Sequence, residues 1–159
     1  MRNKIVLGVD PGFDRIGVAV LDNNKVLYSH CLETNRKLPH EERLLDIGDS
    51  VRKIIKKWEP NSLAIESLFF NQNITNALKV SEAKGVIIYE VMRAGLEVFE
   101  YSPQAIKIAV TGYGKADKRQ IATMVKRLVK LPVRSSKRLD DEIDAIALCI
   151  THLATKKSI

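Results

Sequence analysis

The chain has 159 residues, 45% of them apolar, and a formal net charge of +7, which fits one globular domain over residues 1–159 and excludes a disordered or low-complexity protein. Cys31 and Cys149 lie in apolar contexts without metal-ligand spacing, so we expect buried thiols in a reducing compartment and not a disulfide scaffold. Asp10 interrupts the apolar run of residues 5–9, which excludes this run as a signal peptide or membrane span and favours a cytoplasmic location.

The predicted elements begin with three strands, over residues 4–10, 15–21 and 25–33. The turn between the second and third strands contains two asparagines, which tolerate positive φ, so these strands form a hairpin. Apolar periodicity and turn residues then predict helix 40–58, strand 62–66, helix 73–93, strand 96–101, a short helix opened by Pro103, a loop over residues 111–117, helix 118–130 and helix 140–155.

This order of elements predicts an α/β fold with a five-stranded mixed sheet, in which three antiparallel strands are followed by parallel strands flanked by helices. A right-handed crossover can return strand 62–66 beside strand 4–10. Asp10 and Glu66 would then stand at the carboxyl ends of neighbouring parallel strands, where open α/β sheets place their sites.

Basic residues are concentrated between residues 104 and 138. This stretch has ten basic residues and a single acid, Asp117, whereas the rest of the chain has sixteen basic and eighteen acidic residues. Such a surface is typical of proteins that neutralise a polyanion. The alternative is a solvated lysine-rich surface, and charge alone does not separate the two.

Carboxylates form the candidate chemical site. Asp10 and Glu66 end strands, and Asp141 and Asp144 are three residues apart on one helix face. Four such groups at one sheet edge repel one another unless they stay partly protonated or bind cations, and oxygen ligands favour Mg²⁺ or Mn²⁺. Two ions would suit an in-line phosphoryl displacement. Taken alone, each of these acids can also be explained by a structural role, because Asp-Pro-Gly is a turn sequence and acids at 140–144 can cap a helix.

The RuvC family of Holliday-junction resolvases (crossover junction endodeoxyribonucleases), within the ribonuclease H-like superfamily, has motifs that this chain resembles in order and without large gaps. The similar segments are GVDPGFDRIGVAV, LAIESLFFNQN, NALKVSEAKGV, VFEYSPQAIKIAVTGYGKADK and DDEIDAIALCITH. The resemblance implies a ribonuclease H-like, dimeric, Mg²⁺-dependent endonuclease that nicks two strands of a four-way DNA junction symmetrically, in recombination and repair. It also implies two Mg²⁺ per subunit, with Mn²⁺ as a substitute, and a branch-migration helicase as partner.

The resemblance assigns residues by motif. Asp10, Glu66, Asp141 and Asp144 match the catalytic metal-binding acids, with a one-residue ambiguity between Asp140 and Asp141. Lys107 and Lys118 match lysines near the scissile phosphate, which would bind it or stabilise its developing charge. Ser67 follows Glu66 where the family more often has Gln, which leaves the local strand contacts open.

The segment after Glu66 is expected to face DNA. Phe69 matches a residue that would stack on an unpaired base or wedge between base steps, whereas Phe70 is expected to pack beneath the loop; the alternative places both in the core. Asn73 is a candidate DNA contact that equally suits a helix N-terminus. Further candidate DNA-binding residues are Lys107, Lys115, Lys118 and Arg119. Residues 111–118 lack the spacing of a P-loop, so no nucleotide cofactor is expected.

Helix 73–93 is apolar almost all round, so one face can cover the sheet while a second needs another cover. A homodimer is expected, in line with the resemblance, and the alternative is cover by residues 96–130. Three other functions remain open. A ribonuclease H-type hydrolase of RNA–DNA hybrids would use an acid on helix 40–58, where Glu41, Glu42 and Asp46 are available. An actin-like ATPase would need two such domains. A non-catalytic junction-binding protein would bind DNA without cutting it.

Overall fold

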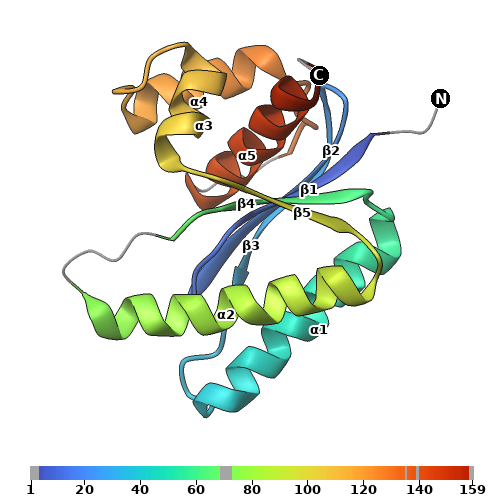
Figure 1. Cartoon of the computed structure of the whole chain (residues 1–159), viewed down its shortest axis with the longest axis vertical. Helices are drawn as coiled ribbons and strands as arrows, with labels where there is room; N and C mark the ends of the chain where they lie inside the picture. Colours follow the sequence, from blue (N-terminus) through green and yellow to red (C-terminus); the bar gives the residue numbers. More distant parts are fainter. Residues whose placement is uncertain (1–3, 69–72, 135, 139, 158–159) are drawn as a thin grey trace.

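The computed structural model describes residues 4–68, 73–134, 136–138 and 140–157. Figure 1 shows one twisted sheet between two layers of helices. The strands are β1 (Ile5–Asp10), β2 (Arg15–Asp22), β3 (Lys25–Glu33), β4 (Ser62–Glu66) and β5 (Glu97–Tyr101). The helices are α1 (His40–Trp58), α2 (Ile74–Arg93), α3 (Pro103–Thr111), α4 (Lys118–Leu128) and α5 (Asp140–Lys157).

The sheet has the strand order β3-β2-β1-β4-β5. β1 pairs antiparallel with β2 and parallel with β4, and β5 continues the parallel half. Asn23 adopts a φ of 53° in the turn between β2 and β3, the positive value for which asparagine is suited. The predicted mixed sheet, with β4 returning beside β1, is therefore confirmed.

Helix α4 ends at Leu128, two residues before the predicted end. Val129 has an extended backbone, and the chain leaves the helix to meet the start of β3. The Lys130 N–H donates to the carbonyl of Asn24 at 2.7 Å, and the Val26 N–H donates to the carbonyl of Lys130 at 3.0 Å. Pairing with β3 thus replaces the last predicted helical turn.

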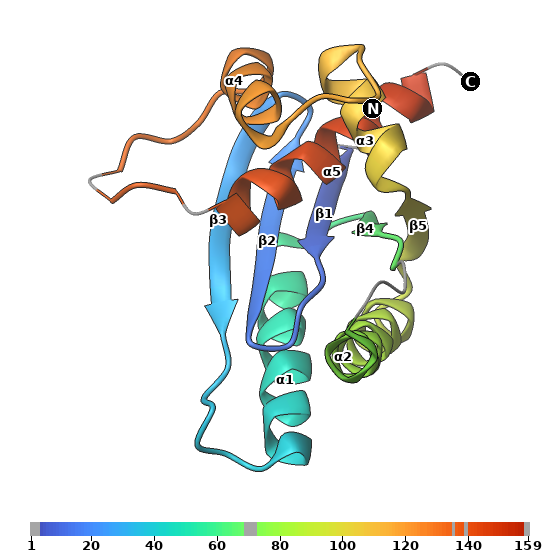
Figure 2. The same cartoon turned by 90° about the vertical axis from the view of Figure 1, so that its left-hand side faces the viewer.

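The two faces of the sheet carry different helices. Figure 2, turned by 90°, shows α1 and α2 below the sheet and α3, α4 and α5 on the other side. Side chains alternate along each strand, so Leu7 and Val9 of β1 pack with the core of α1 and α2, whereas Val6 packs with the core of α5. By the same alternation Asp10, four residues after Val6, is on the α5 face.

Two glycines allow α5 to lie directly on the sheet. A Cβ at Gly8 would stand 2.3 Å from the carbonyl oxygen of Ala145, and a Cβ at Gly17 would stand 1.9 Å from that of Asp141. Any side chain at these positions would therefore push the helix away. Close contact buries most of α5, including Ile146 and the free thiol of Cys149.

Helix α2 keeps an exposed apolar face, which consists of Ile74, Leu78, Tyr89 and Met92. The alternative cover by residues 96–130 is wrong for α3 and α4, which lie on the opposite face of the sheet (Figure 1). In the part of the chain that the structure describes, no helix combines the length and apolarity needed to span a membrane.

Candidate active site

The site begins at two adjacent strand ends. Asp10 is the last residue of β1 and Glu66 is the last residue of β4, and the preceding residues, Val9 and Ile65, are partners in the parallel register. The carboxyl groups of Asp10 and Glu66 are hydrogen-bonded to each other. Asp144 approaches from α5, since its negative charge is the strongest charge effect on Asp10. The fold therefore brings three of the four predicted acids within reach of one another's charge.

These three carboxyl groups are costly to ionise together. Burial, with the negative charges of Asp144 and Glu66, raises the pKa of Asp10 to about 8. Burial also raises the pKa of Asp144 to about 6, although the positive charge of Lys118 opposes the shift. The pKa of Glu66 is raised by burial, against the hydrogen bond from Asp10 and the charges of Lys118 and Lys107. The lysines do not offset the effect of burial on these carboxyl groups, and a bound divalent cation would add further positive charge.

Two lysines lie close enough to the acids for their charges to act on them. Lys107 comes from α3, and Lys118 is the first residue of α4. Together with Glu66 and Asp144 they line a cavity of about 310 Å³. The lining of this cavity therefore combines acidic and basic side chains. A phosphate entering it would meet both cationic side chains and carboxyl groups.

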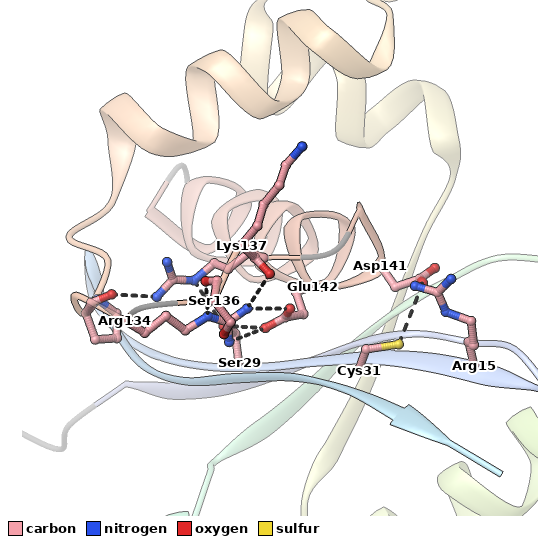
Figure 3. Close-up of polar contacts among 10 residues, drawn as sticks. Arg15, Ser29, Cys31, Arg134, Ser136, Lys137, Asp141 and Glu142 are labelled. Carbon is pink, nitrogen blue, oxygen red and sulfur yellow. Dashed lines mark hydrogen bonds and ion pairs between the residues drawn. The ribbon is translucent and has the colours of Figure 1, made fainter. Parts of the chain in front are cut away.

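The fourth predicted acid has a different partner. The carboxylate of Asp141 is 2.9 Å from the guanidinium of Arg15 on β2, and the Cys31 thiol donates to it at 3.7 Å (Figure 3). Among the described residues, no three His, Cys, Asp or Glu side chains stand close enough together to form a ready-made metal site. Asp140 is exposed, and Asp141 but not Asp140 contributes to the raised pKa of Asp10, which favours Asp141 as the matched residue.

Comparison with known proteins decides the family. The family model described as crossover junction endodeoxyribonuclease RuvC matches residues 6–152. The chain belongs to the RuvC family. The curated RuvC of Finegoldia magna is 40% identical over 156 residues, which cover 96% of this chain and 94% of that protein. The curated RuvC of Chloroflexus aurantiacus is 39% identical over 157 residues, with coverage of 96% and 94%.

Solved structures agree with this assignment. The structure of Thermus thermophilus RuvC in complex with a Holliday junction substrate superposes with a TM-score of 0.91 at 28% identity, over 98% of this chain and 96% of that one. The expected ribonuclease H-like fold is confirmed. RuvC proteins are metal-dependent endonucleases that resolve Holliday junctions in DNA recombination and repair, and the chain is an enzyme of this class.

A buried ion pair at the start of α5 was not predicted from the sequence. Glu142 is 2% exposed and binds the guanidinium of Arg134 through both carboxylate oxygens, at 2.9 and 2.7 Å (Figure 3). Ser29 of β3 donates to Glu142 at 3.1 Å. These bonds tie the segment before α5 to the sheet beside Asp141. The available signal was the helical spacing of Glu142 with Ile146, which places an acid on the buried face.

The predicted DNA-binding residues of this RuvC chain have mixed positions. Lys115 and Arg119 are exposed, in the loop before α4 and in its first turn. The side chain of Asn73 accepts a hydrogen bond from the Asn76 N–H at 3.1 Å, so it caps α2, the alternative that the sequence left open. Phe69 and Phe70 lie outside the described residues.

The acids of α1 do not join the site. Glu41, Glu42 and Asp46 are exposed on a helix that packs on the face of the sheet opposite to α5. Asp10 is on the α5 face, so the sheet separates these acids from it. This removes the main structural reason for the ribonuclease H-type alternative.

Proposed function

We propose that this chain nicks two strands of a four-way DNA junction symmetrically and that Asp10, Glu66, Asp141 and Asp144 hold two Mg²⁺ ions per subunit, for which Mn²⁺ can substitute. The observation that supports the proposal is the convergence of three partly buried carboxyl groups with raised pKa values, two of which, those of Glu66 and Asp144, share one cavity with Lys107 and Lys118. Hard oxygen ligands in this number suit Mg²⁺ and Mn²⁺.

The chemistry follows from the acidic and basic side chains at the site. Bound divalent ions would activate the attacking water and stabilise the leaving oxygen. The carboxylates of Asp10, Glu66 and Asp144 provide the negative charge that retains such ions. Lys107 and Lys118 stand where the phosphate would enter, and their ammonium groups would bind it and stabilise the charge that develops on its oxygens.

The DNA surface would continue beyond the cavity. Lys115 and Arg119 are exposed and would contact the phosphate backbone of the junction arms. Phe69 is assigned to the junction centre from the sequence motif alone, where stacking on a base would keep the strands apart. Asn73 would contact the phosphate backbone of the DNA while its side chain caps α2.

The partners would match the symmetry of the substrate. The exposed apolar face of α2 is suited to a second copy of the chain, because a twofold dimer presents two equivalent sites to a four-way junction. A branch-migration helicase is the further partner implied by the family resemblance. The single nuclease domain over residues 1–159 and the cytoplasmic location remain predictions.

The test compares the chain with its Asp10→Asn variant on a labelled four-way junction, a plain duplex and an RNA–DNA hybrid, each with Mg²⁺ and with EDTA. We expect paired symmetric nicks in the junction alone, lost in EDTA and in the variant. Cutting of the hybrid would instead favour the ribonuclease H-type hydrolase. Junction binding without cutting under any condition would favour the non-catalytic binding protein.

A further inference from the structure

Among the described residues, Asp141 differs from the other three acids in forming a direct ion pair. The Nη2 atom of Arg15 is 2.9 Å from Oδ2 of Asp141, and the Cys31 thiol donates to the same oxygen at 3.7 Å. Figure 3 shows the three side chains meeting between β2, β3 and the start of α5. Asp10 and Asp144, by contrast, have raised pKa values because nearby charge does not compensate their burial.

The position of Asp141 allows it to join the other acids without a change of fold. It precedes Asp144 by three residues on α5, so the two side chains leave neighbouring positions on one side of the helix. Rotation of the Asp141 side chain, and not movement of the backbone, is the change needed to release its carboxylate from Arg15. The backbone of Asp141 is fixed, because its carbonyl lies directly over Gly17.

Arg15 is suited to exchange its partner. Its side chain is 45% exposed, so DNA can reach the guanidinium while it holds Asp141. Guanidinium binds carboxylate and phosphate with the same planar pair of donors, and it remains charged at all working pH values. A DNA phosphate and Asp141 are therefore equivalent ligands for Arg15, and a divalent cation and Arg15 are alternative ligands for Asp141.

We propose that Arg15 is an internal counter-ion that competes with the divalent cation for Asp141, so that DNA phosphate completes the metal site by taking Arg15 away. The inference rests on the proposed function, since it needs a metal at the carboxylates. It makes Arg15 a positioning residue and not a catalytic one. It also links the two ligands, because DNA that releases Asp141 tightens metal binding and, reciprocally, metal tightens DNA binding.

The first test measures Mn²⁺ affinity without DNA, by electron paramagnetic resonance or calorimetry, in the whole chain and in Arg15→Gln. We expect roughly three- to tenfold tighter binding in the variant, from the loss of a partly exposed ion pair and of one nearby positive charge. Arg36→Gln is the matched control, because Arg36 loses the same charge but pairs with Asp14. Its affinity should stay within about twofold of the parent chain.

A second set of variants separates competition for Asp141 from a general effect of charge on metal affinity. In Asp141→Asn the further change Arg15→Gln should raise Mn²⁺ affinity by a clearly smaller factor, since there is no carboxylate to release and only the loss of a nearby positive charge remains. Unchanged or weaker binding in Arg15→Gln alone would overturn the proposal, as would an equal effect of that change in the Asp141→Asn background. Circular dichroism of each variant checks the fold, and Arg15→Lys, which keeps the charge but not the planar donors, should be intermediate.

The link to DNA is tested with a junction whose linkages around the crossover are phosphorothioates that slow cleavage. This junction should tighten Mn²⁺ binding by a larger factor in the parent chain than in Arg15→Gln, and an equal factor in both would refute the link. The Asp10→Asn variant distinguishes failure of the proposed metal site from failure of the role proposed for Arg15. If it leaves Mn²⁺ affinity unchanged, the metal site of the proposed function is wrong; if it abolishes binding while Arg15→Gln has no effect, only the role of Arg15 fails.

Discussion

Stability without metal should fall as the pH rises, because Asp10 holds its proton more tightly in the folded chain. Its pKa is about 8 when folded, against 3.8 for the free side chain. The folded state therefore binds more protons than the unfolded state between these values, and the contribution is fully present below about pH 4 and lost as the pH rises to about 8. Replacing Asp10 by Asn removes the ionisable group and should flatten this dependence.

The size of the effect follows from the same pKa difference. A shift of about four pKa units corresponds to roughly 6 kcal/mol at most, at 1.36 kcal/mol per unit. Because Asp10 and Glu66 are hydrogen-bonded and share the cost, about half of this is expected. At pH 9 in EDTA, Asp10→Asn should therefore be more stable than the parent chain by about 3 kcal/mol, or about 6–12 °C in Tm for a domain of this size.

Thermal melts in EDTA from pH 4 to pH 9 measure the effect, and Asp14→Asn is the control. Asp14 pairs with Arg43 and Arg36, and the hydrogen bond from Arg43 lowers its pKa. The same chemical change at Asp14 should therefore destabilise the chain at neutral pH. A parent chain with constant stability from pH 4 to pH 9, or an Asp10→Asn variant that is less stable at pH 9, would refute the reasoning. Added Mg²⁺ should recover stability above pH 7 in the parent chain only.

Three further predictions concern cutting, folding and DNA affinity. Lys107→Ala should lower the single-turnover rate of junction nicking about a hundredfold, by loss of a phosphate contact. Lys53→Ala, on α1 at the other face of the sheet, should leave this rate unchanged, and equal effects of the two variants would contradict the assigned phosphate position. Glu142→Gln should lower the free energy of unfolding by about 2 kcal/mol in urea titrations, because it weakens the pairing of Arg134 with both oxygens of a buried carboxylate. An unchanged midpoint would contradict this. Junction affinity should fall steeply with salt, and Lys115→Ala should reduce the slope of log K against log salt concentration by about 0.9; an unaltered slope would remove Lys115 from the interface.

The elements of the fold were predictable because their signals are local. Alternation and turn residues gave strand and helix bounds that differ from the structure by at most two residues. The adjacency of Asp10 and Glu66 followed from one topological rule about parallel strands. The end of α4 was missed because Lys130 leaves the helix for a non-local pairing with the start of β3, which no periodicity within 118–130 reveals.

The partners of the site residues were harder to predict. Asp141 and Asp144 have the same local pattern, yet one contacts Arg15 while the other faces Asp10. That choice depends on which strand lies beneath each turn of α5, and it requires the three-dimensional register of β2 against the helix. Glu142 was missed for the same reason, since its guanidinium partner approaches from a loop.

Because α5 packs directly on Gly8 and Gly17, the spacing of the acids depends on two residues that have no side chain. A methyl group at either position would meet the backbone of α5 within 2.3 Å, so the helix would have to rise from the sheet. Asp144 would rise with it, while Asp10 would stay on its strand. Substitutions there should act like changes of ligand length at a metal centre, which alter the distance between donors and leave every donor in place. The geometry of the acids therefore depends on two sequence positions that contribute no chemical group to the site.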